Sequence, residues 1–181
     1  NTVLQFSDDF TYGNMYWDVT GANGGGITDG KLLLPDTFGT IRLNEEITWD
    51  DYTFMFDLKF LKEYSGTEAN PYFFIKLGGF GFYFYPGRRD NISWIKDDWS
   101  QSGSIGIYKT GFGIKYNIKI VTKGKICVIY IKTENDKSYQ QIGYLSFVNK
   151  RSLQFGGWYN TEIDNVKVYT NENAKNTVKE K

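Results

Sequence analysis

Hydrophobic and polar residues alternate along most of this chain, and short runs of Gly, Asn and Asp interrupt the alternation. The clearest case is residues 52–62, where apolar side chains from Phe54 to Phe60 occupy every second position. The positions between them include Met55 and Asp57. A period of two places one set of side chains on each face of an extended strand. The pattern therefore predicts many short β-strands, each with one buried face.

We expect about fourteen strands, separated by turn-forming residues. They cover Val3–Phe6, Tyr16–Val19, Lys31–Leu34, Gly39–Leu43, Tyr52–Lys62, Tyr72–Leu77, Phe80–Tyr85, Ile92–Lys96, Ile105–Tyr108, Lys115–Lys123, Lys125–Thr133, Gln141–Phe147, Leu153–Phe155 and Glu162–Tyr169. Three of the turns predict hairpins, at Leu77–Phe80, Thr122–Lys125 and Asn135–Ser138. The sequence shows no internal repeat of fixed period, which argues against a propeller or a solenoid. The predicted fold class is therefore all-β, a two-sheet antiparallel β-sandwich.

The amino-acid composition supports this fold class. Aromatic residues make up 18% of the 181 residues, whereas alanine, the strongest helix former, occurs three times. A chain of this length suits one domain. We assign residues 1–170 to a single sandwich domain. We assign residues 171–181, where aromatic residues disappear and charged residues accumulate, to a tail or linker.

Charge and missing residue types exclude several classes of function. Lys plus Arg and Asp plus Glu both number 21, and this balance argues against a nucleic-acid or anionic-membrane partner. The chain has no histidine, which excludes His-based catalytic triads and most zinc or copper sites. The single cysteine, Cys127, has no partner for an intramolecular disulfide. Neither end shows a charged region followed by an apolar stretch, so we expect no signal peptide. No run of about 18 apolar residues occurs, so we expect no membrane insertion.

Short motifs at the two ends of the chain form a recognisable series. They are Phe6-Ser7-Asp8-Asp9-Phe10, Trp17, Thr28-Asp29-Gly30-Lys31-Leu32 and Ile163-Asp164-Asn165-Val166-Lys167-Val168-Tyr169. In this order the motifs resemble the concanavalin A-like jelly roll (laminin-G/glucanase-like) of bacterial extracellular glycan-binding and glycan-cleaving proteins. The resemblance covers the ends of the domain and not its middle. It implies a jelly-roll sandwich in which the first and last strands meet.

The resemblance also implies a structural calcium ion, because related sandwiches commonly hold one where the first and last strands meet. Asp8 and Asp9 near one end of the chain and Asp164 near the other offer the carboxylate oxygens that Ca²⁺ prefers. We take these three residues as candidate calcium ligands. The alternative is that Asp9 caps a turn and Asp164 accepts hydrogen bonds from backbone or hydroxyl groups.

The jelly roll hosts both enzymes and binding modules, so the fold alone does not distinguish them. Laminarinase-like glucanases carry Glu-x-Asp-x-x-Glu on one strand, and Glu162-Ile163-Asp164 matches the first half of that motif. Lys167 stands where the second Glu would be, and glycoside hydrolysis usually requires two carboxyl groups. We therefore assign no catalytic residues and expect a protein that is not an enzyme.

Residues 80–100 combine aromatic and hydrogen-bonding side chains in a way that suits a sugar. Sugar rings present apolar faces edged by hydroxyl groups, which flat aromatic rings and planar polar groups can contact. The candidate ligand-binding residues in this segment are Tyr83, Tyr85, Arg88, Asn91, Trp94, Asp97 and Trp99. Further candidates outside it are Asp57 and Tyr72, on or near the non-core phases of their strands, and Trp158, in another loop with aromatic residues. The alternative for the aromatic residues is a place in the core, and for Asp57 an exposed ion pair with a lysine.

These observations predict a carbohydrate-binding module of a secreted or cell-surface bacterial protein. We expect its ligand to be a neutral or weakly acidic polysaccharide or oligosaccharide, because a chain of zero net charge suits a polyanion poorly. The protein would be a monomer or a module of a larger chain. Two alternatives stay open. One is a glycoside hydrolase of the laminarinase-like class, and the other is a protein–protein adhesion or structural domain.

Overall fold

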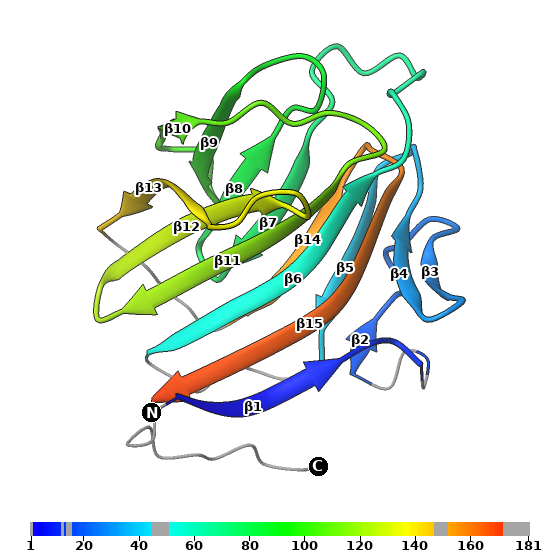
Figure 1. The fold of residues 1–181 in the computed structure, drawn as a ribbon. Helices are drawn as coiled ribbons and strands as arrows, with labels where there is room; N and C mark the ends of the chain where they lie inside the picture. Colours follow the sequence, from blue (N-terminus) through cyan, green and yellow to red (C-terminus); the bar gives the residue numbers. More distant parts are fainter. Residues whose placement is uncertain (1, 12, 14–15, 45–50, 147–151, 172–181) are drawn as a thin grey trace.

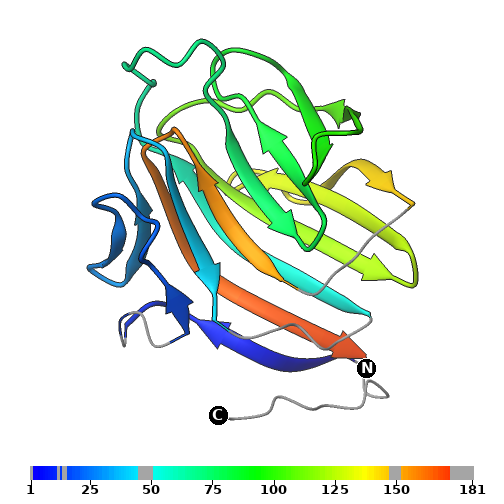
Figure 2. The same ribbon diagram turned by 180° about the vertical axis from the view of Figure 1, so that it is seen from behind.

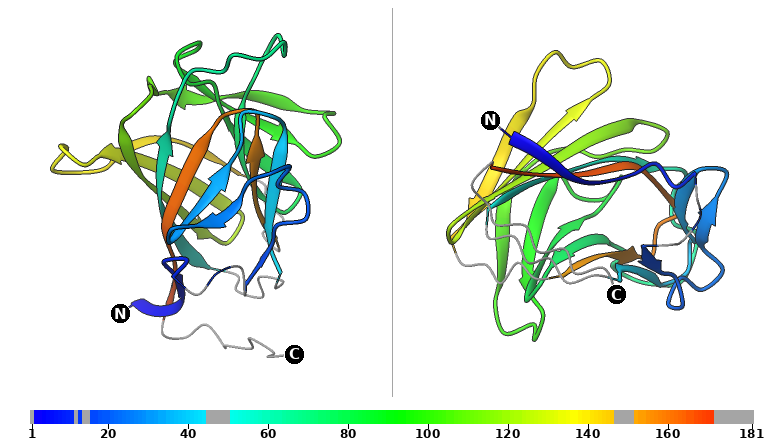
Figure 3. Two further views of the ribbon diagram at one scale, coloured as in Figure 1. Left: turned by 90° about the vertical axis from the view of Figure 1, so that its right-hand side faces the viewer. Right: turned by 90° about the horizontal axis from the view of Figure 1, so that it is seen from below.

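A computed structural model describes residues 2–11, 13, 16–44, 51–146 and 152–171, and it contains two antiparallel β-sheets packed face to face (Figures 1 and 2). Seen from the side and from below, the sheets form two layers (Figure 3). The predicted all-β sandwich is therefore confirmed. None of the described segments forms a helix long and apolar enough to cross a membrane.

The first sheet, sheet A, contains both the first and the last strand. Its strands are β1 (Thr2–Asp8), β3 (Gly26–Thr28), β4 (Lys31–Leu34), β6 (Tyr52–Phe60), β11 (Lys115–Lys123), β12 (Ile126–Thr133), β13 (Gln140–Leu145) and β15 (Thr161–Asn171). They lie in the order β13-β12-β11-β6-β15-β4-β3 (Figure 1). β1 pairs with the C-terminal part of the long strand β15, beyond the part that pairs with β4.

The second sheet, sheet B, is built from the middle of the chain together with three strands from nearer its ends. Its strands are β2 (Trp17–Asp18), β5 (Gly39–Leu43), β7 (Phe73–Leu77), β8 (Phe80–Phe84), β9 (Asn91–Lys96), β10 (Ser102–Ile107) and β14 (Leu153–Gly157). They lie in the order β10-β9-β8-β7-β14-β5-β2.

Every strand predicted from the sequence overlaps an observed strand. The three predicted hairpins join β7 to β8, β11 to β12 and β12 to β13. Phe147, the last residue of one predicted strand, lies outside the described residues. The pattern does not reveal β3, because the glycine run that precedes it hides any alternation of side chains.

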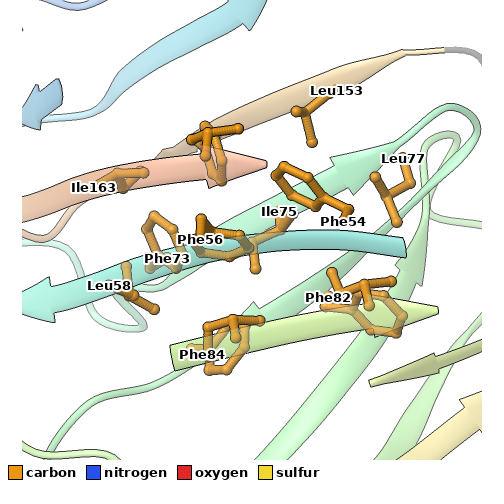
Figure 4. Packing of buried hydrophobic residues seen from close by; sticks show 14 of the residues in the cluster. Phe54, Phe56, Leu58, Phe73, Ile75, Leu77, Phe82, Phe84, Leu153 and Ile163 are labelled. Carbon is orange, nitrogen blue, oxygen red and sulfur yellow. The ribbon is translucent and has the colours of Figure 1, made fainter. Parts of the chain in front are cut away.

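The core fills the space between the sheets with aromatic side chains (Figure 4). On β6 the inward positions from Phe54 to Phe60 are at most 2% exposed, as the alternation predicts. Phe60 meets Phe73 of sheet B edge to face, with ring centroids 5.4 Å apart. Phe56 meets Phe155 in the same way at 5.1 Å. Burying each such side chain contributes about 1.5–3 kcal/mol, so these contacts hold the two sheets together.

The first and last strands lie side by side, as the terminal motifs imply. Thr2 is opposite Asn171, and Asp8 is opposite Val166, in an antiparallel pair. Asn171 therefore belongs to β15, although the composition of residues 171–181 had placed it in the predicted tail. Residues 172–181 of that tail lie outside the described residues.

At the opposite side of the sandwich the edge strands of the two sheets touch each other, β10 of sheet B against β13 of sheet A. Two glycines make this approach possible. A Cβ atom on Gly143 would overlap the carbonyl oxygen of Ile105, and one on Gly106 would overlap that of Ile142. Side chains at these positions would push the two edges apart. The glycines therefore let the sandwich close on this side.

Candidate functional site

A cluster of aromatic side chains lies on the outer face of sheet B, away from the core. β7 and β8 carry apolar or aromatic side chains on both faces, so that Phe73 and Phe82 point inward while Phe74 and Tyr83 point outward. We call this cluster the outer aromatic face. It consists of Phe38, Tyr72, Phe74, Tyr83, Tyr85, Ile95 and Trp99. The structure thus brings together four predicted site residues from three separate segments, Tyr72, Tyr83, Tyr85 and Trp99.

Trp99 is the exposed member of the outer aromatic face. Its side chain is 59% exposed, and its ring centroid lies 6.0 Å from that of Tyr83 and 6.5 Å from that of Tyr72. The backbone of Trp99 has a φ of 59°, a left-handed conformation that is unusual for a bulky side chain. Strain of this kind persists where the surroundings impose it, and it is commonly found at functional sites.

The turn around Trp99 holds this conformation through local hydrogen bonds. The backbone N–H of Trp99 donates to the carbonyl oxygen of Lys96 at 2.8 Å. The backbone N–H and the hydroxyl of Ser100 both donate to Oδ1 of Asp98, at 3.0 and 2.5 Å. These bonds keep the pKa of the Asp98 carboxyl below its usual value. The turn therefore fixes the direction in which the indole projects.

Tyr83 and Tyr85 lie beneath this surface. Tyr83 is 2% exposed and Tyr85 is 8% exposed, so their rings support their neighbours and offer little open area. Burial raises the pKa of the Tyr83 hydroxyl well above its usual value, and the neighbouring Tyr72 adds to the effect. Tyr72 is partly exposed, and its pKa is also raised by burial. Trp99 is therefore the most accessible ring of this face, and Tyr72 and Phe38 are accessible in part.

Charged groups surround the outer aromatic face. Lys76 lies over the ring of Phe74, 5.1 Å from its centroid, and forms an ion pair with Asp97 at 3.3 Å. Asp97 is close enough to Tyr83 to help raise the pKa of its hydroxyl. The guanidinium of Arg89 lies over the ring of Tyr85 at 4.9 Å. Asp97 thus lies beside the cluster, as predicted.

The remaining candidates of this segment make contacts within the protein. Arg88 donates to the carbonyl oxygen of Ala69 at 3.2 Å, and its neighbour Arg89 has the ring contact with Tyr85. The Asn91 side chain donates to the hydroxyl of Ser93 at 3.0 Å, on the outward side of β9. Arg88 and Asn91 are therefore near the cluster without touching its rings in any contact described here.

Trp158 extends the aromatic region at one border. Its ring lies 5.3 Å from that of Phe38, and its backbone N–H donates to the carbonyl oxygen of Tyr72 at 2.9 Å. The Trp158 ring also meets Tyr64 edge to face at 6.1 Å. Trp158 thus joins the outer aromatic face to the core at this border.

Trp94 does not share the outer aromatic face. It is paired with Phe82 across β8 and β9, on the side of the sheet that faces the core, and it packs against the core cluster. A Cβ atom on Gly103 would lie 2.9 Å from the indole nitrogen of Trp94, which shows how closely β10 approaches it. Trp94, one of the candidate ligand-binding residues, therefore lies on the opposite side of sheet B from Trp99 and does not share a binding surface with it.

Asp57 lies on the other sheet, so it does not join the outer aromatic face either. Its carboxylate accepts hydrogen bonds from the side-chain amides of Asn117 at 2.5 Å and Asn165 at 2.8 Å, and it pairs with Lys115 at 2.8 Å. The pKa of Lys115 is raised by this contact with Asp57. The alternation correctly placed Asp57 on an outward position, but it did not tell which sheet that position belongs to.

The three candidate calcium ligands do not come together. Asp8 is buried and accepts hydrogen bonds from the Phe10 N–H at 2.7 Å and from the Trp17 indole N–H at 2.8 Å. Asp9 accepts one from the Thr11 N–H at 3.1 Å. In the described residues no group of three or more Asp, Glu or Cys side chains is arranged to hold a metal ion. These residues therefore do not fit a calcium site built from Asp8, Asp9 and Asp164.

Asp164 instead lines a polar hollow of about 190 Å³ on the outer face of sheet A. Its neighbours there include Asp57, which is directly opposite it on β6, and Glu162. The sequence motif did not reveal that Asp57 from another strand stands beside Glu162 and Asp164. Glu162 forms an ion pair with Lys31 at 3.0 Å, and both oxygens of Asp57 have partners. The hollow is therefore lined by charged side chains, of which Lys31 and Glu162 form one ion pair and Lys115 and Asp57 another.

Phe38 and Phe74 belong to the outer aromatic face but were not sequence candidates. The available signal was the run Tyr72-Phe73-Phe74-Ile75, in which both phases of one strand are apolar or aromatic. A strand with apolar side chains on both faces is either covered by protein on both faces or presents an apolar surface to solvent.

Comparisons with known proteins define the fold. Neither a scan against protein-family models nor a search of curated protein sequences found a match. Among solved structures, the exoplasmic/lumenal domain of VIP36 in its Ca²⁺/Man2-bound form has a TM-score of 0.72 and 11% identity, covering 97% of this chain and 92% of that chain. Peanut lectin, solved with a 9mer peptide, has a TM-score of 0.65 and 11% identity, covering 94% of this chain and 98% of that chain.

A third similar structure belongs to an enzyme. Xylan β-1,4-xylosidase from Bacillus halodurans C-125 has a TM-score of 0.68 and 9% identity, and the match covers 91% of this chain but 39% of that chain. At these identities the likeness shows the fold and not the function. The protein has the concanavalin A-like lectin fold, in agreement with the resemblance of its terminal motifs.

Proposed function

We propose that the protein is a carbohydrate-binding module and that the outer aromatic face binds the sugar. The observation that carries this proposal is Trp99, an exposed indole in a left-handed turn, supported from below by the buried ring of Tyr83. A rigid exposed aromatic ring is the group best suited to stack on the apolar face of a sugar. A merely structural turn would gain nothing from a strained, exposed tryptophan.

Polar groups beside Trp99 complete the chemistry of such a site. Lys76 and Asp97 form a half-exposed ion pair next to Tyr83, and their free hydrogen-bonding positions suit the hydroxyl groups of a sugar. The ligand is a neutral or weakly acidic polysaccharide or oligosaccharide at this face. Affinity should be modest, because hydroxyl groups exchange hydrogen bonds with water for hydrogen bonds with protein at little net gain.

The similar structures support the proposal at the level of fold. VIP36 has been solved with mannose-containing ligands, and peanut lectin is a lectin. VIP36 was also solved with Ca²⁺ bound, in the same forms that hold the sugar. We propose no calcium ion for this protein at Asp8, Asp9 and Asp164, because these residues do not form a common site among the described residues. We place the protein outside the cell or on its surface, where polysaccharides are met, as a monomer or as a module of a larger chain.

The proposed function is binding without catalysis. Glu162, Asp164 and Asp57 share one face, but Glu162 is paired with Lys31 and Asp57 is held by Lys115, Asn117 and Asn165. A glycosidase needs two carboxyl groups that can act on the sugar, whereas both oxygens of Asp57 and one oxygen of Glu162 are already engaged by other side chains of the protein. Release of reducing sugar from a β-glucan by the parent, lost in Glu162→Gln, would contradict this part of the proposal.

A glycan array followed by titration calorimetry tests the binding. The parent should retain a set of related glycans, and Trp99→Ala should weaken their binding by at least about tenfold, which corresponds to ~1.4 kcal/mol. The matched control is Tyr144→Ala, which removes another exposed aromatic side chain, this one from β13 of sheet A. Equal binding by the parent and Trp99→Ala would overturn the assignment. Retention of no glycan by the parent would favour the protein–protein alternative.

A further inference from the structure

The outer face of sheet A concentrates positive charge, although the chain as a whole is neutral. Seven lysines and three carboxylates occupy outward positions on the described strands of this sheet. They are Lys31, Lys59, Lys115, Lys119, Lys123, Lys132 and Lys167, with Asp57, Glu162 and Asp164. Zero net charge therefore hides an uneven distribution over the surface.

Most of these lysines form no ion pair with a carboxylate of the described residues. Lys31 pairs with Glu162 and Lys115 with Asp57. In the part of the chain that the structure describes, the other five lysines of this face make no ion pair. By contrast, the charged groups that point outward from the strands of sheet B are paired, Arg42 with Asp18 and Lys76 with Asp97. The unneutralised charge is thus specific to sheet A.

The strand register arranges these groups in two neighbouring rows across sheet A. In the first row Tyr130, Lys119, Met55 and Lys167 are opposite one another on β12, β11, β6 and β15. Because strands lie about 4.8 Å apart, Lys119 and Lys167 are separated by about 10 Å along this row. Cations at such a spacing suit a ligand with regularly spaced negative groups.

Two tyrosines hold Lys119 in place. Its ammonium group lies 4.5 Å from the ring centroid of Tyr130 and 4.4 Å from that of Tyr139. Lys132 also lies over the ring of Tyr139, at 5.0 Å. Contact with aromatic rings orients an ammonium group without neutralising it. Lys119 and Lys132 are therefore fixed cations, unlike flexible surface lysines.

The second row offers hydrogen-bonding groups instead of charge alone. Lys132, Asn117, Asp57 and Asp164 are opposite one another on β12, β11, β6 and β15. Asp164 lines the polar hollow described above, which lies where this row crosses β6 and β15. Side-chain amides donate and accept hydrogen bonds and carboxylates accept them, so together these groups can bind hydroxyl groups. A row of cations thus runs beside a row of hydroxyl-binding groups.

We propose that this face of sheet A is a second binding surface, separate from the outer aromatic face, and that it binds an anionic polysaccharide. The carboxylate or sulfate groups of the ligand meet Lys119, Lys132 and Lys167. Its hydroxyl groups meet Asn117, Asp57 and Asp164 in the neighbouring row. Nucleic acid fits less well, because duplex DNA carries one negative charge per about 1.7 Å and would bring phosphates against Asp57, Asp164 and Glu162.

The experiment measures binding of oligogalacturonate, a carboxylated probe, by titration calorimetry at low ionic strength. The double variant Lys119→Gln/Lys132→Gln should bind on the order of twentyfold more weakly, from about fivefold per lysine. Lys119→Arg/Lys132→Arg keeps the charges and should retain most of the affinity. The matched control is Lys62→Gln/Lys96→Gln, which removes two lysines that lie outside this face. Added salt should weaken binding by the parent and by the control alike.

A further variant separates this inference from the proposed function. Trp99→Ala should bind oligogalacturonate as well as the parent does, because Trp99 lies on sheet B. The proposal is overturned if the parent does not bind oligogalacturonate, or if the glutamine double variant binds it as well as the parent does. It is also overturned if single-stranded DNA or vesicles containing phosphatidylserine bind through the same lysines more tightly than oligogalacturonate does.

Discussion

The indole ring of Trp99 lies across the phenol ring of Tyr83, with the ring centroids 6.0 Å apart and the planes inclined by 61°. One of these rings is mostly exposed and the other is buried. A buried ring that carries an exposed one forms a rigid platform, since the lower ring cannot move aside when a ligand presses on the upper one. Ligand binding by this platform would explain both the backbone strain at Trp99 and the exposure of its side chain.

Trp99→Gly should separate binding from stability. Glycine adopts a φ of 59° without strain, and the relief should offset most of the packing lost over Tyr72 and Tyr83. We expect the free energy of unfolding to change by less than about 1 kcal/mol, and glycan binding to be lost. Urea denaturation and titration calorimetry measure the two effects. Trp94→Ala should have the opposite effect, because Trp94 packs against the core. We expect it to lower the free energy of unfolding by about 2–4 kcal/mol and to leave glycan binding unchanged. The platform is disproved if the two variants behave alike.

Asp8→Ala should destabilise the domain by about 2 kcal/mol, because the buried indole N–H of Trp17 and the N–H of Phe10 lose their acceptor. The melting temperature should fall by about 4–8 °C. The neighbouring substitution Asp9→Ala serves as the control, since Asp9 is exposed and accepts its hydrogen bond from the nearby Thr11. Calorimetry of both variants with and without calcium measures the stability contributed by Asp8 and Asp9 and also shows whether either residue binds calcium. A calcium-dependent rise in the melting temperature of the parent, absent in Asp9→Ala, would show that a metal site exists after all.

Gly143→Ala should be among the most damaging single substitutions, at about 3 kcal/mol. The added methyl group would meet the backbone oxygen of Ile105, which cannot rotate away as a side chain would. Gly79→Ala is the matched control, because a Cβ atom there has nothing within 4 Å. Denaturation curves of the two variants should therefore differ clearly. Similar stabilities would mean that the two sheets do not meet closely at this edge.

Stability should decline from about pH 10 upward. Burial raises the pKa of Tyr52 far above its usual value, and its hydroxyl has no hydrogen-bond partner among the described residues. The unfolded chain releases this proton near its ordinary pKa, whereas the folded chain retains it, so alkali favours unfolding. Tyr52→Phe should make the decline shallower, and it should stabilise the protein at neutral pH by about 1 kcal/mol. A steeper alkaline decline in Tyr52→Phe would contradict this account.

The sequence predicts which way a side chain points better than it predicts what that side chain meets. The alternation in β6 correctly separates buried Phe54 from outward Asp57. The same alternation places Asp57 and Tyr83 both outward, yet they lie on opposite surfaces of the sandwich, because sheet membership depends on long-range pairing. In β9 both phases contain apolar residues, so periodicity could not decide that Trp94 points inward. The contact of Asp8 with Trp17 spans nine residues, and the alternation does not reveal it either.

The pairing of β1 with β15 determines how the domain would respond to mechanical force. Thr2 and Asn171 face each other at one end of an antiparallel pair. A pull applied at these two positions therefore loads the hydrogen bonds one after another, and each contributes only about 1 kcal/mol. β1 should peel away at low force until the pull reaches Asp8, where the bond to the buried Trp17 ties the strand to the core. The sandwich would then lengthen under tension by one strand before its core is disturbed.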